Sequence, residues 1–377
     1  MKARRVWAVA RKESLHIVRD PRSLGMAIAI PMLLLVLFGY ALTLDVDNVP
    51  MVVWDQSGSP ASRDLLSRFA GSRYFDVRGT VQDYRAVERA IDRREALLAL
   101  VIPADFARRL EVSRPVAVQA IVDGSDANTA ALAIGYANAV ILGHSQDVTL
   151  QHLRRTGTAA AQAALELRPR VWYNPDMQSR NAIVPGLTAV IMMVIAAMLT
   201  SLTIAREWER GTMEQLISTP VKGSELILGK LIPYFAIGML DVLIAVLTGE
   251  FLFGVPLRGS VALVFGMAAV FLAGALALGM VISIASRNQL LATQLAMVAT
   301  FLPAFLLSGF MYAIANMPWP IQWATRLVPA RYFVALLKGI YMKGVGLEVL
   351  GLEAALLATF GAAMVALAVL RFKKRLC

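Results

Sequence analysis

Residues 182–205 read AIVPGLTAVIMMVIAAMLTSLTIA, a run in which no side chain is charged. A helix needs about 20 predominantly apolar residues to cross the hydrocarbon core of a bilayer. This run is therefore predicted to be a transmembrane helix. Comparable apolar stretches occupy residues 24–44, 231–253, 261–286, 290–310 and 349–370. The sequence thus predicts a polytopic α-helical membrane protein with six transmembrane helices.

The composition of the chain indicates the same class of protein. Hydrophobic residues make up 58% and charged residues 17% of the 377 positions, whereas soluble domains hold about 45–50% and about 25%. The only cysteine, Cys377, excludes an internal disulfide. Three scattered histidines, His16, His144 and His152, give no metal-binding pattern. We therefore predict no metal site and no catalytic residue in this chain.

The basic residues gather at the two ends of the chain. Residues 2–22 hold seven lysines and arginines against two acids, and residues 371–377 hold four against none. These segments supply nine of the formal net charge of +11, whereas residues 45–180 hold 16 arginines and 16 acids. Because cytoplasmic segments carry an excess of Lys and Arg, both termini are predicted to be cytoplasmic. The net charge reflects membrane topology and does not indicate a nucleic-acid partner.

This topology divides the chain into four parts. They are a cytoplasmic amphipathic interfacial helix over 1–22, a first transmembrane helix over 23–44, an extracytoplasmic domain over 45–180, and a five-helix transmembrane domain over 181–377. The last part contains a cytoplasmic loop over 206–230 and an external segment over 311–348. Only the extracytoplasmic domain is large enough to fold in water.

The extracytoplasmic domain is predicted to be α+β. Short apolar runs of strand length occupy 50–54, 96–102 and 116–122. Helical patterns lie over 61–70, 83–94 and 103–111, and an alanine-rich stretch from about 125 to 166 is predicted to be a long helix.

The chain lacks a phosphate-binding loop of the form G-x-x-x-x-G-K-[ST]. The nearest candidate, Gly223 to Lys230, has one residue too many and is followed by Leu231 in place of a hydroxyl side chain. Nucleophile-elbow and metalloprotease motifs are also missing from the sequence. A multi-span protein of this kind is predicted to be a channel, a secondary transporter or the membrane half of a split primary pump.

The cytoplasmic loop over 206–230 carries four basic and four acidic residues. Mixed charges favour docking on a protein surface, since binding to anionic lipid requires a basic cluster. A solvated turn whose charges pair with one another explains the composition equally well.

Residues 206–220, followed by 229–234, resemble the signature loop of ABC-2 type permeases. Further similar segments are 123–130, 184–187, 307–310, 316–318 and 330–333. They lie in order across nearly the whole chain and match the multidrug-exporter-like subgroup that has a large external domain between its first two helices. Ala315 and Glu250 depart from the family pattern, which leaves the substrate class open.

The resemblance implies an ABC-2, type V exporter-like permease fold in the bacterial cytoplasmic (inner) membrane, with re-entrant helices in 311–348. It implies a dimer with a second copy or a similar permease, and a separate ABC ATPase subunit that uses ATP and Mg, so that this chain needs no cofactor. The exported substrate is expected to be hydrophobic or amphipathic, drug-like or lipid-like. A periplasmic adaptor protein is a further partner compatible with this group.

The resemblance also implies that residues 206–220 form the helix that couples to the ATPase. The predicted coupling residues are Arg206, Glu207, Glu209, Arg210, Gly211, Thr212, Glu214 and Pro220. Ion pairs to the ATPase are expected from Glu207, Glu209, Arg210 and Glu214. Close approach is expected at Gly211 and Thr212.

Two acids fall within the predicted third span, Asp241 near its middle and Glu250 near its outer end. Intramembrane acids are costly and are therefore candidates for function. A hydrogen bond or packing role within the chain is an equal reading for Asp241, and Glu250 lies close to water. Two alternative functions stay open, a proton-coupled secondary transporter that uses these acids and a membrane-anchored scaffold or receptor.

Overall fold

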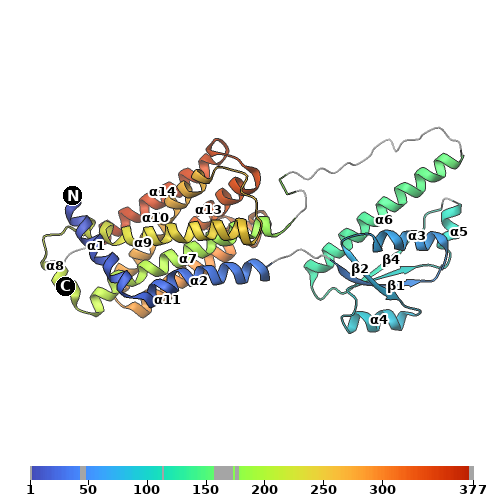
Figure 1. Ribbon diagram of the computed structural model, residues 1–377, viewed down its shortest axis with the longest axis horizontal. Coiled ribbons are helices and arrows are strands. Elements are labelled where there is room, and N and C mark those ends of the chain that lie inside the picture. The colour runs from blue at the N-terminus through green and yellow to red at the C-terminus, as the bar shows by residue number, and fades with distance from the viewer. Residues whose placement is uncertain (1, 43–47, 113, 157–172, 175–177, 373–377) are drawn as a thin grey trace. The chain divides into compact units, whose positions relative to one another are not determined.

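The computed structural model describes residues 2–42, 48–112, 114–156, 173–174 and 178–372 (Figure 1). Residues 157–166 of the predicted long helix and the basic residues after 372 lie outside this part. The chain divides into two compact units, one made of Met1–Thr43 with Val171–Cys377 and the other of Leu44–Arg170. We call them the helical unit and the sheet unit.

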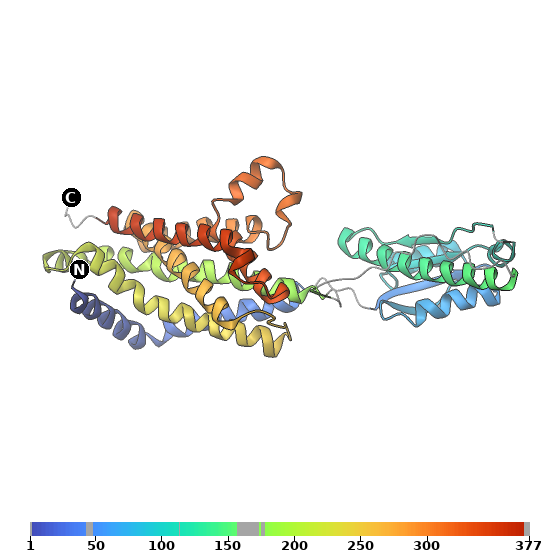
Figure 2. The same cartoon turned by 90° about the horizontal axis from the view of Figure 1, so that it is seen from above.

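The helical unit is built from long helices that run side by side (Figure 2). In chain order its α-helices are α1 (Ala3–Arg19), α2 (Pro21–Ala41), α7 (Arg180–Glu209), α8 (Thr212–Ser218), α9 (Gly223–Leu247), α10 (Val261–Ser286), α11 (Gln289–Leu307), α12 (Trp319–Thr325), α13 (Pro329–Lys338) and α14 (Leu347–Arg371). Single turns of other helix types cover Thr248–Leu252, Ile314–Asn316 and Gly339–Lys343.

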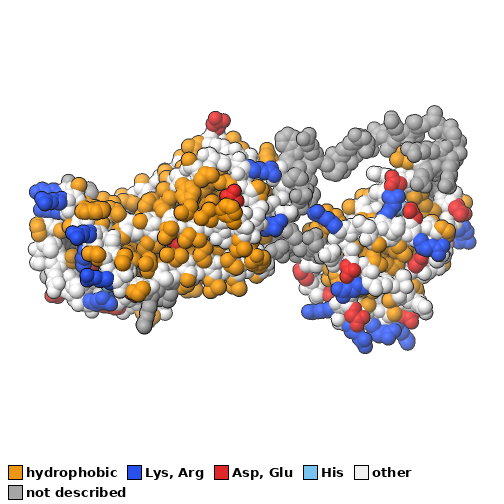
Figure 3. Space-filling view, in the orientation of Figure 1, with side chains coloured by type: hydrophobic (Ala, Val, Ile, Leu, Met, Phe, Trp, Pro, Cys, Tyr) orange, Lys and Arg blue, Asp and Glu red, His pale blue; other side chains and the backbone are white. Residues whose placement is uncertain are grey.

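Five helices of the described residues are long and apolar enough to cross a membrane: α7, α9 with the turn that extends it to Leu252, α10, α11 and α14. The apolar part of α2 covers Ala27–Ala41 and is shorter. Hydrophobic side chains cover the middle of this unit, and Lys and Arg gather at the end that holds α1 and α8 (Figure 3). The chain is thus a helical protein with several membrane-compatible spans.

The centre of the helical unit is α7, because its residues from Val184 to Ala205 are mostly buried. Helix α10 packs closely against it at Gly279, where an added Cβ would lie 2.3 Å from the Ala197 carbonyl oxygen. The Thr200 hydroxyl donates to the Leu276 carbonyl at 2.8 Å across the same contact. Small residues and a hydroxyl that bonds to the neighbouring backbone are typical of helix packing in membranes.

The third long helix begins earlier than predicted. Helix α9 starts at Gly223, whereas the apolar run starts at 231. Its first turn is closed by Glu225, whose carboxylate accepts from the backbone N–H of Lys222 at 3.0 Å. A first-turn acid that binds a free N–H of the helix end stabilises the helix beyond its apolar part.

The sheet unit has four strands: β1 (Val49–Asp55), β2 (Phe75–Thr80), β3 (Leu98–Ile102) and β4 (Gln119–Val122). Their order is β2-β1-β3-β4, and only β4 is antiparallel to its neighbour. The predicted strands over 50–54, 96–102 and 116–122 are confirmed. Strand β2 was not predicted, because it lies at the sheet edge and most of its side chains are exposed, so it lacks a strong hydrophobic pattern.

Helices cover both faces of the sheet. Helices α3 (Pro60–Ala70), α5 (Phe106–Glu111) and α6 (Ala127–Thr156) pack on one face, and α4 (Tyr84–Asp92) packs on the other (Figure 1). The helix predicted over 103–111 begins later in the structure, since α5 starts at Phe106 after a turn. Phe106 contributes to the core beneath the sheet.

Candidate coupling site of the helical unit

A sharp reversal joins α7 to α8. Helix α7 ends at Glu209, and Gly211 adopts a φ of +69° before α8 begins at Thr212. This left-handed conformation is open to glycine at little cost and is unfavourable for other residues. The short helix α8 then lies at the end of the helical unit that also holds α1 (Figure 1).

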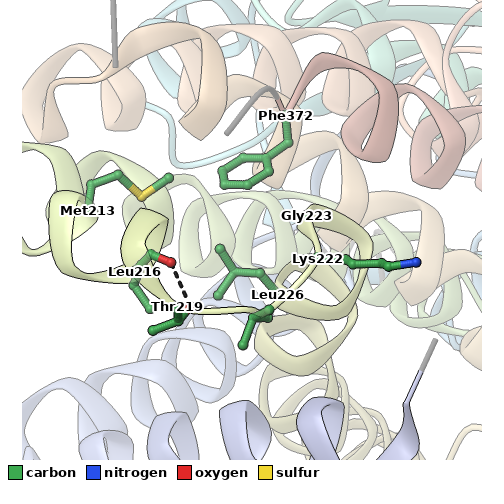
Figure 4. A pocket seen from close by; sticks show the side chains of 8 residues that line it. Met213, Leu216, Thr219, Lys222, Gly223, Leu226 and Phe372 are labelled. Atoms are coloured by element: carbon green, nitrogen blue, oxygen red, sulfur yellow. Dashed lines mark hydrogen bonds between the residues drawn. The ribbon is translucent and has the colours of Figure 1, made fainter. Parts of the chain in front are cut away.

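The inner side of α8 rests on an apolar base. Met213 is buried, and Leu216 faces Leu226 of α9 and Phe372 after α14 (Figure 4). The Phe372 ring lies so close to Gly223 that an added Cβ there would approach it to 2.8 Å. The space left among these side chains holds no more than about one water molecule. The base therefore fixes the position of α8 by direct packing.

The outer side of α8 is polar and exposed. It presents Glu214 and Gln215, and Arg210, which precedes the turn, is also exposed. Within the described part of the chain, neither the Arg210 guanidinium nor the Glu214 carboxylate has an ion-pair partner. Two of the predicted coupling charges are therefore available to another protein.

Glu207 is turned inward instead. Its carboxylate lies 3.1 Å from the Lys230 ammonium and 3.3 Å from the Lys12 ammonium, and it accepts a hydrogen bond from Thr212. Only 12% of the Glu207 side chain is exposed. These contacts join the end of α7 to α1, α8 and α9.

Lys230 is the centre of this buried network. It is 2% exposed, and its ammonium also lies 3.1 Å from the carboxylate of Glu13 on α1. The other Glu13 oxygen accepts from the Tyr234 hydroxyl at 3.1 Å. A buried charge is tolerated where it is paired and hydrogen-bonded. The network of Glu13, Lys230, Glu207 and Tyr234 therefore fixes α1 on α9.

A second set of contacts joins the N-terminal residues to the loop that follows α8. The buried Glu225 carboxylate accepts from the Lys2 backbone N–H at 2.8 Å and lies 3.7 Å from the Arg5 guanidinium. Arg5 also donates to the Pro220 carbonyl at 2.6 Å. Pro220 thus serves as a contact for α1.

The remaining predicted coupling residues also have partners within the chain. Arg206 lies 3.2 Å from a ring nitrogen of His16 on α1. The Glu209 carboxylate accepts from the backbone N–H of Gln289 at 2.7 Å and thereby caps the start of α11. Of the eight residues, Arg210 and Glu214 are thus exposed without an ion-pair partner among the described residues, and Gly211 forms the turn. The other five make contacts that join α7 and α8 to α1, α9 and α11.

The sequence pattern missed several residues that take part in these contacts. Lys230 and Glu225 were counted as loop charges, and Glu13 was placed on an interfacial helix. On α1, Ala10 is 2% exposed whereas Trp7 is 67% exposed. The opposite charges of Glu13 and Lys230 are the only sequence signal for their contact, and they lie 217 residues apart.

The two acids of α9 and its extension lie in different surroundings. Asp241 is 1% exposed, and neither of its oxygens has a hydrogen-bond partner among the described residues. Of the predicted alternatives for Asp241, packing within the chain and a role in a pathway therefore stay open. Glu250 lies exposed on the turn Thr248–Leu252.

Comparison with known proteins places this architecture in a family. Residues 21–370 match the model of the ABC-2 family transporter protein. The chain is 40% identical to the probable multidrug ABC transporter permease YbhS of Escherichia coli, over 99% of this chain and 98% of that protein. It is 30% identical to the probable multidrug ABC transporter permease YbhR, over 92% of each chain, and 24% identical to the inner membrane transport permease YhhJ, over 86% and 85%.

The chain therefore belongs to the ABC-2 family of transporter proteins. It is a multi-pass membrane protein of the permease type, a class whose ATPase activity resides in a partner. The predicted resemblance is confirmed over nearly the whole length.

Proposed function

We propose that this chain is the permease subunit of an ABC exporter that moves a hydrophobic or amphipathic, drug-like or lipid-like substrate outward. The observation that carries the proposal is the construction of α8, which is seated on an apolar base and exposes Arg210 and Glu214. A short helix fixed to three spans and charged on its free side is suited to transmit movement from a docked protein. The similarity to YbhS and YbhR, both named as probable multidrug permeases, supports drug-like substrates.

The same proposal includes the membrane arrangement. Helix α2 also crosses the membrane as the first span of the chain, which brings the number of spans to six. Both termini are cytoplasmic, and the sheet unit is extracytoplasmic. The gathering of Lys and Arg at the end that holds α1 and α8 supports this orientation (Figure 3). The short external helices α12 and α13 are re-entrant, dipping into the membrane from the outer side.

The assembly is proposed to contain two permeases, two ABC ATPase subunits that bind ATP and Mg, and a periplasmic adaptor contacting the sheet unit. Within each permease, Arg210 and Glu214 form ion pairs with the ATPase. Glu207 and Glu209 act indirectly, because their contacts set the position of α8 relative to α1 and α11.

The test is charge reversal on the exposed side of α8. Arg210→Glu and Glu214→Lys are expected to abolish most substrate-stimulated ATP hydrolysis and to weaken co-purification of the ATPase, while thermal stability stays unchanged. Glu348→Lys is the matched control, since Glu348 is equally exposed in the first turn of α14. Variants of α8 that retain the ATPase and full transport would contradict the coupling role.

A second candidate function, proton-coupled transport, is favoured by one observation. The buried Asp241 carboxylate has no described hydrogen-bond partner, and such acids within a membrane mark proton or ion pathways. Transport by purified chain in vesicles on a proton gradient alone, abolished by Asp241→Asn, would favour this function. Transport that requires the ATPase, with Asp241→Asn affecting only protein yield, would favour the exporter.

A further inference from the structure

A large cavity lies at the end of the helical unit opposite α8. It has a volume of about 820 Å³ and opens between the end of α11, helix α13 and the first turns of α14. Among the described residues, three basic side chains line it, Arg326, Arg331 and Lys338, together with one acid, Glu353. The charged groups thus give the cavity a formal excess of two positive charges (three minus one).

Neutral groups hold these cations in place. The Arg331 guanidinium donates to the Thr325 hydroxyl, and the Arg326 guanidinium stacks over the Trp323 ring at 3.8 Å. The Lys338 ammonium donates to the Gly309 carbonyl at 3.1 Å and is partly buried. Each cation is therefore oriented by the fold without being neutralised.

No carboxylate of the described residues lies within 4.0 Å of any of the three cations, Glu353 included. This arrangement differs from the end of the unit near α8, where Lys230 contacts two carboxylates. Cations that converge on a cavity without a counterion fit an anionic group of a ligand.

The position of the cations strengthens this reading. In the orientation proposed above, this end of the unit faces outward, where short segments of membrane proteins are poor in Lys and Arg. Residues 311–348 nevertheless hold Arg326, Arg331, Lys338 and Lys343 against one acid, Glu348. Membrane topology does not account for this excess of positive charge.

The surroundings of the cavity are apolar and suited to the membrane interface. Leu352 and Leu356 of α14 line it and are 69% and 40% exposed. Trp323 is 57% exposed beside Arg326. Tryptophan is enriched at the level of lipid headgroups, where its ring contacts both apolar chains and polar groups. The fitting ligand therefore has an anionic head and an apolar tail.

We propose that this cavity binds an anionic phospholipid of the surrounding bilayer, its phosphate held by Arg326, Arg331 and Lys338 and its acyl chains along Leu352 and Leu356. The lipid is a bound component of the permease and is distinct from the exported substrate. We assign the lipid to the outer leaflet of the membrane, and only this assignment rests on the proposed function. Removal of Glu353 strengthens binding, because its carboxylate repels the phosphate.

Lipid retention by the full-length chain, purified without an ATPase, tests the proposal. The chain is extracted from vesicles with equal parts of phosphatidylglycerol and phosphatidylcholine, and bound lipids are counted by native mass spectrometry. We expect retained phosphatidylglycerol in the wild type. The double variant Arg326→Gln, Lys338→Gln is expected to weaken its retention about tenfold or more, since two cations near an anionic lipid are lost.

Two matched variants complete the experiment. Arg258→Gln removes an exposed cation outside the cavity, in the segment that contacts Tyr341, and is expected to leave retention unchanged. Glu353→Gln is expected to raise retention, a gain that a misfolded protein would not give. Two results would overturn the proposal. In the first, the wild type retains phosphatidylglycerol and phosphatidylcholine equally, and in the second, the double variant retains as much phosphatidylglycerol as the wild type.

An additional arm separates lipid from a free anion. Inorganic phosphate at millimolar concentration is expected not to displace phosphatidylglycerol, because it lacks the acyl chains. Displacement by phosphate alone would overturn the lipid assignment. None of these measurements involves ATP hydrolysis or transport, so their failure is distinguishable from failure of the exporter function.

Discussion

The two ends of the helical unit use charge in opposite ways. Near α8, Lys230 is buried between two carboxylates, those of Glu13 and Glu207. At the other end, Arg326 and Lys338 border a cavity and are held by a ring and a carbonyl. The first arrangement satisfies its charges within the chain and fixes helices to one another. The second leaves charge available and is suited to a ligand.

The most destructive change predicted by this comparison is Lys230→Met. It leaves the carboxylates of Glu13 and Glu207 buried without their shared cation, and removal of one partner of a buried ion pair costs about 3–5 kcal/mol. We expect a marked loss of thermal stability and of monodisperse protein. Lys222→Met is the control, because Lys222 is exposed. Equal stability of both variants would show that the network contributes little.

A packing change comes next in size. At Gly279 an added Cβ would approach the Ala197 carbonyl oxygen of α7 to 2.3 Å, whereas at Gly266 of the same helix nothing lies within 4 Å. Gly279→Ala is expected to destabilise the protein by about 1–3 kcal/mol, the usual cost of overpacking. Gly266→Ala should be neutral in the same thermal unfolding measurement, and a similar loss in both would contradict the close α7–α10 contact.

The reversal before α8 provides a smaller and more local test. Gly211→Ala places a Cβ in the left-handed conformation, which costs about 1–2 kcal/mol. We expect faster hydrogen exchange in peptides from α8 and weaker stimulation of the ATPase, with the spans unaffected. Gly351→Ala serves as the control, since Gly351 lies in α14 with open space around it. Unchanged exchange in α8 would mean that the turn tolerates other residues.

In the sheet unit, His144 represents a third case, a titratable group that is buried without a hydrogen-bond partner among the described residues and lies 3.6 Å from the Asp64 carboxylate. Burial, assisted by the nearby Arg68, lowers the pKa of His144 below its ordinary value, although Asp64 and Asp147 oppose this. The unfolded chain therefore binds a proton below about pH 6.5 that the folded unit rejects. The contribution of His144 to the free energy of unfolding is therefore constant above that pH. It decreases as the pH falls below it, so that the sheet unit becomes less stable.

The measurement is the urea midpoint of the sheet unit in the full-length chain at pH 7.5 and pH 5.5. Tryptophan fluorescence reports the transition, and a Trp54→Phe variant assigns the signal to this unit. His144→Leu is expected to reduce the difference between the two midpoints. A His144→Leu protein with the same pH dependence as the wild type would exclude this residue as its origin.

The smallest change in thermal stability is expected at the cavity between α11, α13 and α14. Arg326→Gln removes an exposed cation without an ion-pair partner among the described residues, so thermal stability should change by no more than about 0.5 kcal/mol. Together with the large loss of thermal stability for Lys230→Met, this outcome would show that the charges near α8 stabilise the fold whereas Arg326 does not. A loss as large as that of Lys230→Met would assign Arg326 a structural role.

Much of the fold could be predicted because it depends on local patterns. Apolar runs predicted the long helices, and short apolar segments predicted three of the four strands. Strand β2 and the start of α9 were missed, because an edge strand and a capped polar turn carry little hydrophobic signal. Helix α2 covers Pro21–Ala41, and Ala27–Ala41 is its described apolar part.

The candidate coupling site was predicted as a segment but not as an arrangement. The loop pattern identified Arg206 to Pro220, yet the sequence could not tell which charges face inward. Glu207 and Glu214 are alike in the sequence, but only Glu207 meets Lys12, Thr212 and Lys230. That choice depends on the direction in which each side chain leaves its helix and on which helix lies opposite.

The sequence by itself determined the class of protein, the number and approximate position of most helices, and the family, because hydropathy and motif order are read along the chain. Only the tertiary structure decided which charges are paired. Glu13 and Lys230 meet across 217 positions, and Arg326 and Lys338 converge on one cavity. Ion pairs and cavities form between segments that are distant in sequence, so their existence depends on how the helices pack.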